Sequence, residues 1–260
     1  MEDRVLLQVE GSIATVTLNR PQVLNAFDSG VWAGLEKAAL KIIAQPKINV
    51  VILTGAGDRA FSAGMDLKAV SSGGVSTAGH RRRKGFDGMW IQKQIFTMYE
   101  DLAVPVIAAI NGYCLGAGLE LILCCDIRLA AEHAIFGLPE VDIRAVPDMG
   151  GTQRLPRLVG PGYAKELILT AHRINAAEAL RIGLVEHVYP REQLMAEARK
   201  LADEIASKDP EAVQAAKRAI TAATSLGLAA GLRYETALAM TTQGEGKKLA
   251  KAAAELYKRI

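Results

Sequence analysis

The stretch "NGYCLGAGLELILCCDI" (residues 111–127) combines two features that normally exclude each other. Its Leu, Ile and Cys residues are typical of a buried helix, but a Gly-Ala-Gly sequence of low helix propensity stands near its start. One carboxylate, Glu120, follows two residues later. An unpaired carboxylate in a core is normally protonated or excluded, because taking its charge out of water is costly. The stretch therefore indicates a site that uses both the glycines and the buried acid.

The composition is that of a globular protein with a sizeable core. Half of the 260 residues are hydrophobic and 23% are charged. This length fits one large domain, or one domain with a helical appendage. The 31 basic and 28 acidic residues give a net charge of +3. Such a balance gives no reason to expect a nucleic-acid or membrane partner.

Three further features predict a soluble, cytoplasmic protein. The three cysteines lie together between residues 114 and 125, which suits buried thiols in a reducing compartment better than a disulfide framework. The start "MEDRVLLQVEG" (1–11) lacks the basic and apolar regions of a signal peptide. The longest apolar stretches are interrupted by Asn111, Glu120 or Asp126, so they are too short to span a membrane.

The first half of the chain alternates predicted strands with helices. Residues 12–18 alternate at period two after Glu10-Gly11, which indicates a hairpin. Two short β-branched runs, 50–55 and 105–112, are typical of strands buried on both faces. Residues 126–137 read as two short strands around a turn at 132–133. A helical stripe of apolar residues runs from 31 to 42, with Asp28 or Ser29 as its N-cap.

From about residue 161 the sequence predicts helices and no further strands. Asn175 and Glu178 form a capping-box pattern, and Gly183 is placed to end that helix. Three more amphipathic helices are predicted at 191–207, 210–225 and 229–257. Residues 71–88, with five glycines and a basic run, form the one insertion predicted to be flexible.

Four stretches together resemble the crotonase, or enoyl-CoA hydratase/isomerase, superfamily. They are "NRPQVLNAF" (19–27), "FSAGMDLK" (61–68), residues 111–127, and "FGLPEVDIRAVPDMGGTQRL" (136–155). They occur in the order and spacing of that superfamily, and "INAAEALRIGLVEHV" (174–188) is also similar. The match covers nearly the whole chain. Its members catalyse hydration, isomerisation and other reactions on one scaffold, so the fold does not by itself fix the reaction.

The resemblance implies an α/β fold in which a spiral of ββα units occupies residues 1–190. A C-terminal α-helical trimerisation region would follow at 191–260, giving a homotrimer or a hexamer made of two trimers. The apolar stripe Leu194, Ala198, Leu201 and Ile205 is expected to need cover from a partner subunit. The resemblance also implies fatty-acid metabolism and β-oxidation as the setting.

The resemblance implies an acyl-CoA thioester substrate whose carbonyl oxygen becomes negative during the reaction. Two backbone N–H donors are needed to stabilise it, and the matching positions are Met65 and Ala117. Glycines allow close approach to the backbone, and a helix N-terminus supplies free donors. No separate cofactor is implied, because CoA is part of the substrate, and the four histidines lack metal-ligand spacing. The implied CoA-binding residues are Ala63, Met65, Asp66, Leu67, Lys68, Gly116 and Ala117.

The same resemblance assigns the two catalytic acids. Hydration of an α,β-unsaturated thioester needs one group that deprotonates water and one that protonates the α-carbon. The superfamily's two glutamates are matched by Glu120 and Glu140, with Glu120 on the water and Glu140 at the α-carbon. The leading interpretation is therefore an enoyl-CoA hydratase. Cys114 is expected to serve packing, and "HRRRK" (80–84) is a candidate contact for CoA phosphates.

Asp148 keeps a second interpretation open. Many hydratases carry a small residue at this position, whereas an acid here resembles the Δ3,5-Δ2,4-dienoyl-CoA isomerases, which would use Glu140 and Asp148 to move a proton. Asp148 as a simple N-cap of the following helix is equally open. A non-catalytic CoA-binding or RNA-binding relative is the third alternative, and the presence of both glutamates and the balanced charge argue against it.

Overall fold

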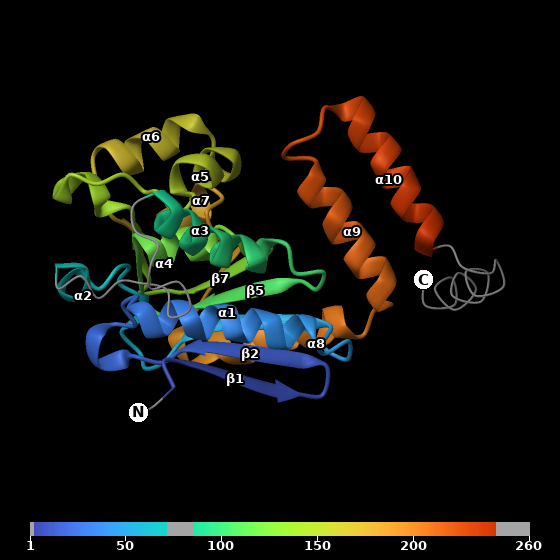
Figure 1. Cartoon of the computed structure of the whole chain (residues 1–260), viewed down its shortest axis with the longest axis horizontal. Coiled ribbons are helices and arrows are strands. Elements are labelled where there is room, and N and C mark those ends of the chain that lie inside the picture. Colours follow the sequence, from blue (N-terminus) through green and yellow to red (C-terminus); the bar gives the residue numbers. More distant parts are fainter. Residues whose placement is uncertain (1–2, 72–85, 243–260) are drawn as a thin grey trace. The chain divides into compact units, whose positions relative to one another are not determined.

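The computed structural model describes residues 3–71 and 86–242 (Figure 1). The basic segment 80–84, most of the predicted insertion 71–88 and the end of the last predicted helix lie outside the described residues. The chain forms two compact units, Met1–Ala206 and Ser207–Ile260. Each unit is therefore considered by itself.

A six-stranded sheet forms the centre of the first unit. Its strands β1 and β2 form the predicted antiparallel hairpin, and the remaining neighbours are parallel. Every residue of β3 and β5 is buried, as continuous apolar runs predict. In spatial order the strands are β1 (Val5–Glu10), β2 (Ile13–Leu18), β3 (Val50–Gly55), β5 (Val106–Ile110), β7 (Ile127–Ala131) and β10 (His187–Tyr189).

A smaller four-stranded sheet carries the segments of the candidate site. Its first three strands are parallel and its last pair is antiparallel. The two strands predicted within 126–137 are confirmed, but they belong to different sheets, β7 to the large one and β8 to the small one. In spatial order the strands are β4 (Ala60–Ser62), β6 (Tyr113–Leu115), β8 (Ile135–Gly137) and β9 (Ile174–Asn175).

The expectation that strands end near residue 161 is wrong. Strands β9 and β10 follow that point, and each adds to the edge of a sheet. They are two and three residues long, too short to show a period in the sequence. They form because β8 and β7 offer unpaired backbone N–H and C=O groups at the sheet edges, to which β9 and β10 bind.

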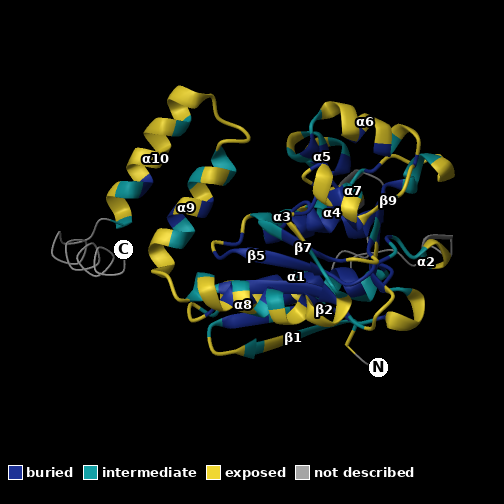
Figure 2. Ribbon diagram, turned by 180° about the vertical axis from the view of Figure 1, so that it is seen from behind, coloured by how far each residue is buried: buried dark blue, intermediate teal, exposed yellow. Residues whose placement is uncertain are grey.

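Helices cover both faces of the large sheet. Residues from alternate positions of β2, β3 and β5 pack on α1, α3 and α4 on one face and on α8 on the other. Figure 2 shows the buried residues gathered in the strands and on the inner helix faces. The helices and 3-10 turns of this unit are η1 (Pro21–Val23), α1 (Ser29–Ile43), α2 (Leu67–Ser71), α3 (Phe86–Glu100), α4 (Ala117–Ile122), η2 (Pro139–Ile143), α5 (Gly151–Val159), α6 (Pro161–Leu169), α7 (Ala176–Arg181), η3 (Arg191–Gln193) and α8 (Leu194–Ala206).

Two predicted helix starts are confirmed by their caps. The Asp28 carboxylate accepts a hydrogen bond from the N–H of Val31 at 3.0 Å, which begins α1. The Asn175 side chain accepts one from the N–H of Glu178 at 2.9 Å, which begins α7. Gly183 follows α7 with a φ of +77°, where glycine is favoured.

The chain's own sheet covers more of the α8 stripe than expected. Leu194 and Ala198 are buried against the chain's own large sheet, and Leu201 and Ile205 pack partly against the same cluster. Helix α8 therefore belongs to the first compact unit, which ends beyond the predicted boundary at residue 190. The assignment of separate roles to residues 1–190 and 191–260 stays a prediction.

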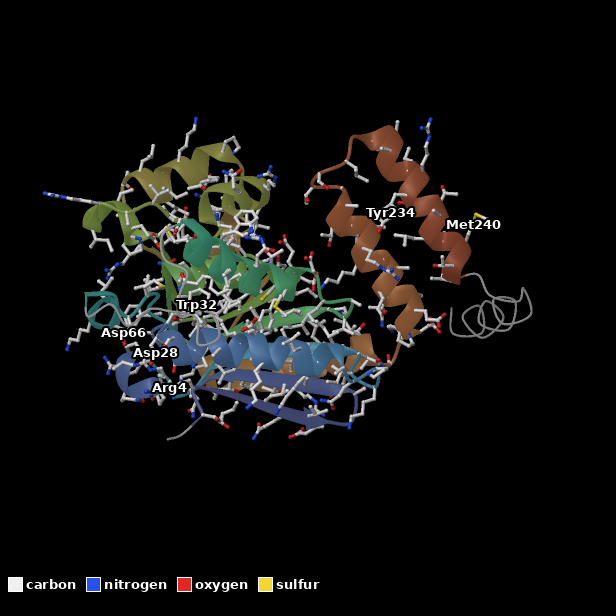
Figure 3. All side chains as sticks on the ribbon, viewed as in Figure 1. Arg4, Asp28, Trp32, Asp66, Tyr234 and Met240 are labelled. Carbon is white, nitrogen blue, oxygen red and sulfur yellow. The ribbon has the colours of Figure 1, made fainter. Side chains whose placement is uncertain are left out.

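The second unit contains α9 (Pro210–Ala222) and α10 (Leu228–Thr242), which pack on each other. Both were predicted, and Asp209 caps α9 through the N–H of Ala212 at 2.9 Å. Several large apolar side chains here remain exposed, among them Leu228 at 80% and Met240 at 74%. Figure 3 labels Met240 on α10. Over residues 3–71 and 86–242, no helix combines the length and apolar character that crossing a bilayer requires.

Candidate active site

Glu120 lies in the first turn of α4 and is almost completely buried, with 2% of its surface exposed. The helix begins at Ala117, because Gly116 takes a φ of +52° and ends strand β6 in a sharp turn. Oε1 of Glu120 accepts a hydrogen bond from the N–H of Gly151 at 2.8 Å. Desolvation nevertheless raises the pKa of Glu120 to about 8, although the Gly151 N–H acts in the opposite direction.

Glu140 lies in η2, directly after strand β8. A Cβ on Gly116 would lie 2.9 Å from Oε1 of Glu140, so the glycine makes room for this carboxylate beside the start of α4. Oε2 of Glu140 is buried and has no hydrogen-bond partner among the described residues. Desolvation, together with the charge of Asp148, raises the pKa of Glu140 to about 7.

The two glutamates interact electrostatically, since the charge of Glu140 adds to the raised pKa of Glu120. Between about pH 7 and about pH 8 the two carboxyl groups together hold one proton. One group can then donate a proton while the other accepts one. The structure thus brings the two predicted catalytic acids into one site.

Asp148 is also part of this cluster, but it does not cap a helix. Helix α5 begins at Gly151 with Gly150 as its N-cap, so the N-cap alternative for Asp148 is wrong. Asp148 is half-buried, and desolvation raises the pKa of its carboxyl group while the positive charge of Lys93 lowers it. Its charge also raises the pKa of Glu120. The site therefore contains three coupled carboxyl groups.

The two predicted oxyanion donors come from adjacent segments. A Cβ on Gly64 would lie 3.3 Å from the N of Ala117, so the chain before Met65 touches the start of α4. Phe27 pairs with the residues on both sides of Met65, because its N–H donates to Gly64 and its carbonyl accepts from Asp66. Ala117 is the first residue of its helix, where the N–H has no carbonyl one turn earlier.

The predicted CoA-binding segment, Ala63 to Lys68, follows strand β4 and leads into α2. The Asp66 carboxylate accepts hydrogen bonds from the N–H of Ala69 at 3.2 Å and from buried Arg20 at 3.1 Å. Arg20 also pairs with Asp28 at 3.2 Å. Desolvation raises the pKa of Asp66, but these hydrogen bonds outweigh it and the net pKa is lowered. Through these hydrogen bonds the Asp66 side chain holds the segment 63–68 in place.

A sequence model of the enoyl-CoA hydratase/isomerase family matches residues 8–255. The chain belongs to this family. It is 42% identical to a crotonyl-CoA hydratase from Syntrophomonas wolfei, over 84% of this chain and 81% of that protein. It is also 42% identical to a short-chain-enoyl-CoA hydratase from Clostridium acetobutylicum, over 90% of this chain and 87% of that protein.

The fold agrees with the same family. The crystal structure of an enoyl-CoA hydratase from Bacillus anthracis matches with a TM-score of 0.88 and 39% identity, covering 98% of this chain and 96% of that one. The crotonase-like α/β fold predicted from four sequence stretches is therefore confirmed.

The sequence did not predict that backbone N–H groups of residues 149–151 bind the Glu120 carboxylate in this member of the enoyl-CoA hydratase/isomerase family. The N–H groups of Met149 and Gly151 both lower the pKa of Glu120 against the effect of burial. Arg154, one turn into α5, contacts the carbonyl of Met149. The Gly150-Gly151 pair before a helix was the available signal, but nothing in the sequence relates it to Glu120.

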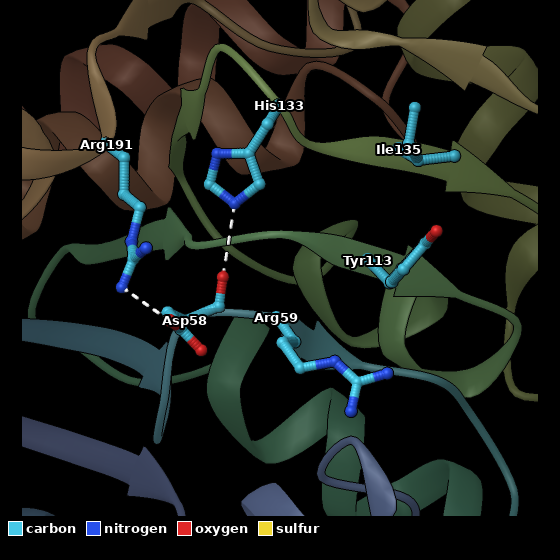
Figure 4. A pocket seen from close by; sticks show the side chains of 6 residues that line it. All are labelled: Asp58, Arg59, Tyr113, His133, Ile135 and Arg191. Carbon is cyan, nitrogen blue, oxygen red and sulfur yellow. Dashed lines mark hydrogen bonds and ion pairs between the residues drawn. The ribbon is translucent and has the colours of Figure 1, made fainter.

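A surface pocket of about 370 Å³ lies away from the glutamates (Figure 4). Except for Arg191 in η3, its residues stand where β4, β6 and β8 begin, whereas Ala63, Gly116 and Glu140 follow the ends of these strands. Its polar groups already bind one another: Arg191 pairs with Asp58 at 2.9 Å, and Nε2 of His133 lies 3.2 Å from the Asp58 carbonyl. The lining residues are Asp58, Arg59, Tyr113, His133, Ile135 and Arg191.

The cysteines of the opening stretch are packing residues. Cys114, Cys124 and Cys125 form no disulfide and all are buried. Desolvation raises the pKa of the Cys114 thiol well above its ordinary value. A neutral buried thiol is a poor nucleophile.

Proposed function

We propose that this protein is an enoyl-CoA hydratase, which adds water across the 2,3 double bond of a 2-trans-enoyl-CoA thioester. The observation that carries the proposal is the pairing of buried Glu120 with half-buried Glu140, whose pKa values of about 8 and about 7 suit proton transfer near neutral pH. Two relatives named as crotonyl-CoA and short-chain-enoyl-CoA hydratases, each 42% identical, support it.

In this proposal the thioester carbonyl oxygen accepts hydrogen bonds from the N–H groups of Met65 and Ala117. The contact between Gly64 and the start of α4 supports it, because it brings these two segments together. Preorganised donors favour the enolate over the neutral carbonyl, since they need no reorientation as charge develops. The CoA moiety follows the backbone of residues 63–68 and the turn at Gly116, and no separate cofactor is needed.

The proton transfers balance across the two glutamates. The reactive form carries its single proton on Glu140, and the higher pKa of Glu120 makes this the less populated of the two one-proton forms. In it, ionised Glu120 takes a proton from water while the water oxygen bonds to C3 of the substrate. The electron pair of the double bond moves onto the thioester to give the enolate. Protonated Glu140 then gives its proton to C2, which yields the 3-hydroxyacyl-CoA. Glu120 ends protonated and Glu140 ionised, so a proton must return to Glu140 before the next turnover.

The test is to mix the protein with crotonyl-CoA and follow the ultraviolet absorbance of the conjugated thioester. Absorbance should fall as 3-hydroxybutyryl-CoA forms, with the product identified by mass. Absence of hydration with crotonyl-CoA and with medium-chain 2-trans-enoyl-CoA would overturn the proposal.

A Δ3,5-Δ2,4-dienoyl-CoA isomerase is the second candidate, and Asp148 is the observation that favours it. Asp148 caps no helix, is half-buried, and is coupled to both glutamates. A carboxylate in that setting is suited to carry a proton along a conjugated acyl chain, with Glu140 at the other end. A 3,5-dienoyl-CoA in the same absorbance assay distinguishes the two, because only an isomerase converts it to the 2,4-dienoyl product.

We further propose that the protein assembles as a homotrimer or a hexamer, works in the cytoplasm, and serves fatty-acid β-oxidation. The exposed apolar side chains of α9 and α10 support assembly, because a partner would remove them from water. The three buried cysteines form no disulfide, which supports a reducing compartment. Light scattering at micromolar concentration checks the assembly, and a stable monomer would contradict it.

A further inference from the structure

Arg154 holds the turn that precedes helix α5. Its Nε and Nη2 donate to one oxygen of Glu100 on α3, at 3.0 and 2.5 Å, and Nη2 also donates to Oγ1 of Thr97 at 3.1 Å. Nη1 faces the carbonyl oxygen of Met149 at 3.4 Å. The guanidinium is thus anchored on α3 and reaches back over the backbone of its own helix start.

The guanidinium also covers Gly150. A Cβ at this position would overlap Nη1 of Arg154, and Gly150 has a φ of +121°, which favours glycine. The turn Met149–Gly151 is therefore shaped by Arg154 on one side. On its other side the N–H of Gly151 meets Oε1 of Glu120 at 2.8 Å.

We propose that Arg154 is a positioning residue, which keeps the N–H groups of Met149 and Gly151 directed at the Glu120 carboxylate. This rests on the proposed role of Glu120 in proton transfer. Arg154 needs no contact with substrate, because it acts through the backbone turn between itself and Glu120. Its planar guanidinium suits this role, since it reaches Glu100, Thr97 and Met149 at the same time.

Without Arg154 the turn loses its anchor and the two N–H groups withdraw from Glu120. Both groups lower the pKa of Glu120 in the intact protein, where it is about 8. Their loss leaves desolvation and the charges of Glu140 and Asp148 unopposed, so the pKa rises. Loss of the positive charge of Arg154, which also interacts with Glu120, acts in the same direction, and Arg154→Lys separates the two effects. Glu120 is then protonated over more of the neutral range and accepts a proton from water less often.

The experiment compares Arg154→Met and Arg154→Lys with the control Arg157→Met in the full-length protein. Arg157 lies on the same helix, is exposed, and contacts the carbonyl of Gln153. The first measurement is the infrared absorption of the protonated Glu120 carboxyl group through a pH titration, assigned by its loss in Glu120→Gln. The second is the pH dependence of kcat/KM for hydration.

In Arg154→Met the Glu120 titration should move to higher pH by about one unit or more, and the acid limb of kcat/KM should move with it. KM should change little. Arg154→Lys keeps the charge but cannot reach all three acceptors, so it should shift the titration by an intermediate amount. Arg157→Met should match the wild type. Thermal unfolding identifies any variant that fails to fold, in which case Arg154→Lys alone decides.

An unchanged Glu120 titration in folded Arg154 variants would overturn the proposal. So would full restoration by lysine, because charge alone would then explain the effect, or an equal shift in Arg157→Met. The infrared titration needs no turnover, so it tests Arg154 even if the protein does not hydrate crotonyl-CoA.

Discussion

The N–H of Gly151 donates a hydrogen bond to the Glu120 carboxylate at 2.8 Å, across 31 positions of the chain. The first residue of α5 therefore meets a side chain from the first turn of α4. A helix N-terminus favours a negative charge, but the burial of Glu120 has the larger effect and its pKa is about 8. The carboxyl group can therefore change its charge near neutral pH, as an acid–base catalyst must.

Replacement of Glu140 should remove most of the activity. Glu140→Gln keeps the size of the side chain but cannot supply a proton to C2. Turnover of crotonyl-CoA should fall by roughly 10²–10⁴, the range for a general acid–base group, while acyl-CoA binding remains. Steady-state kinetics and calorimetric titration with a saturated acyl-CoA measure the two effects. Near-native turnover would remove Glu140 from the mechanism.

Glu120 should make the fold less stable as the pH rises. Its pKa is raised from 4.5 to about 8 in the folded protein, so the folded state binds the proton more tightly than the unfolded state. The resulting stabilisation is fully present below pH 4.5, the pKa of Glu120 in the unfolded chain. It is lost as the pH rises through about 8, the pKa of Glu120 in the folded protein. The shift corresponds to a free energy on the order of 5 kcal/mol.

Glu120→Gln should lack this loss, because the amide does not ionise. Thermal unfolding of both proteins between about pH 5 and about pH 9 provides the comparison. The melting temperature of the wild type should decline relative to that of Glu120→Gln over this range. Parallel curves would mean that Glu120 titrates normally in the folded protein.

Asp148→Asn should distinguish the two candidate reactions. In a hydratase, Asp148 only adds negative charge, and its removal should lower the pKa of Glu120 and Glu140. Hydration should then change less than about tenfold, under roughly 1.4 kcal/mol of barrier, and its acid limb should move to lower pH. In a dienoyl-CoA isomerase the same substitution removes one end of the proton path, and isomerisation should collapse. We expect the mild outcome.

Gly116→Ala should displace Glu140. The new Cβ would lie 2.9 Å from Oε1 of Glu140, and small displacements of reacting groups can lower rates by roughly 10²-fold. Gly11→Ala is the matched control, because Gly11 has a similar φ, +61° against +52°, and open space around it. Gly11→Ala should lose about 1–2 kcal/mol of stability through backbone strain. Gly116→Ala should lose more, because its ψ of −127° lies outside the left-handed region that other residues can adopt. Only Gly116→Ala should lose turnover, and equal turnover in both would contradict the assigned role of this glycine.

Local patterns predicted most of the elements. The hairpin at 5–18, the buried strands β3 and β5, and helix α1 with its Asp28 cap follow from alternation, apolar runs and capping residues, which act within a few positions. The resemblance to the enoyl-CoA hydratase/isomerase superfamily also implied Glu120, Glu140, Met65 and Ala117 as candidate site residues.

The sequence by itself determined which residues could form strands, helices and a buried acidic site, because period, caps and glycines act locally. Only the tertiary structure decided that α8 covers the chain's own sheet, that β9 and β10 complete sheet edges, and that Asp148 caps no helix. It also placed the Gly151 N–H on Glu120 and Arg154 behind that turn. Burial and long-range hydrogen bonds depend on which elements pack together, and no short stretch of sequence contains that information.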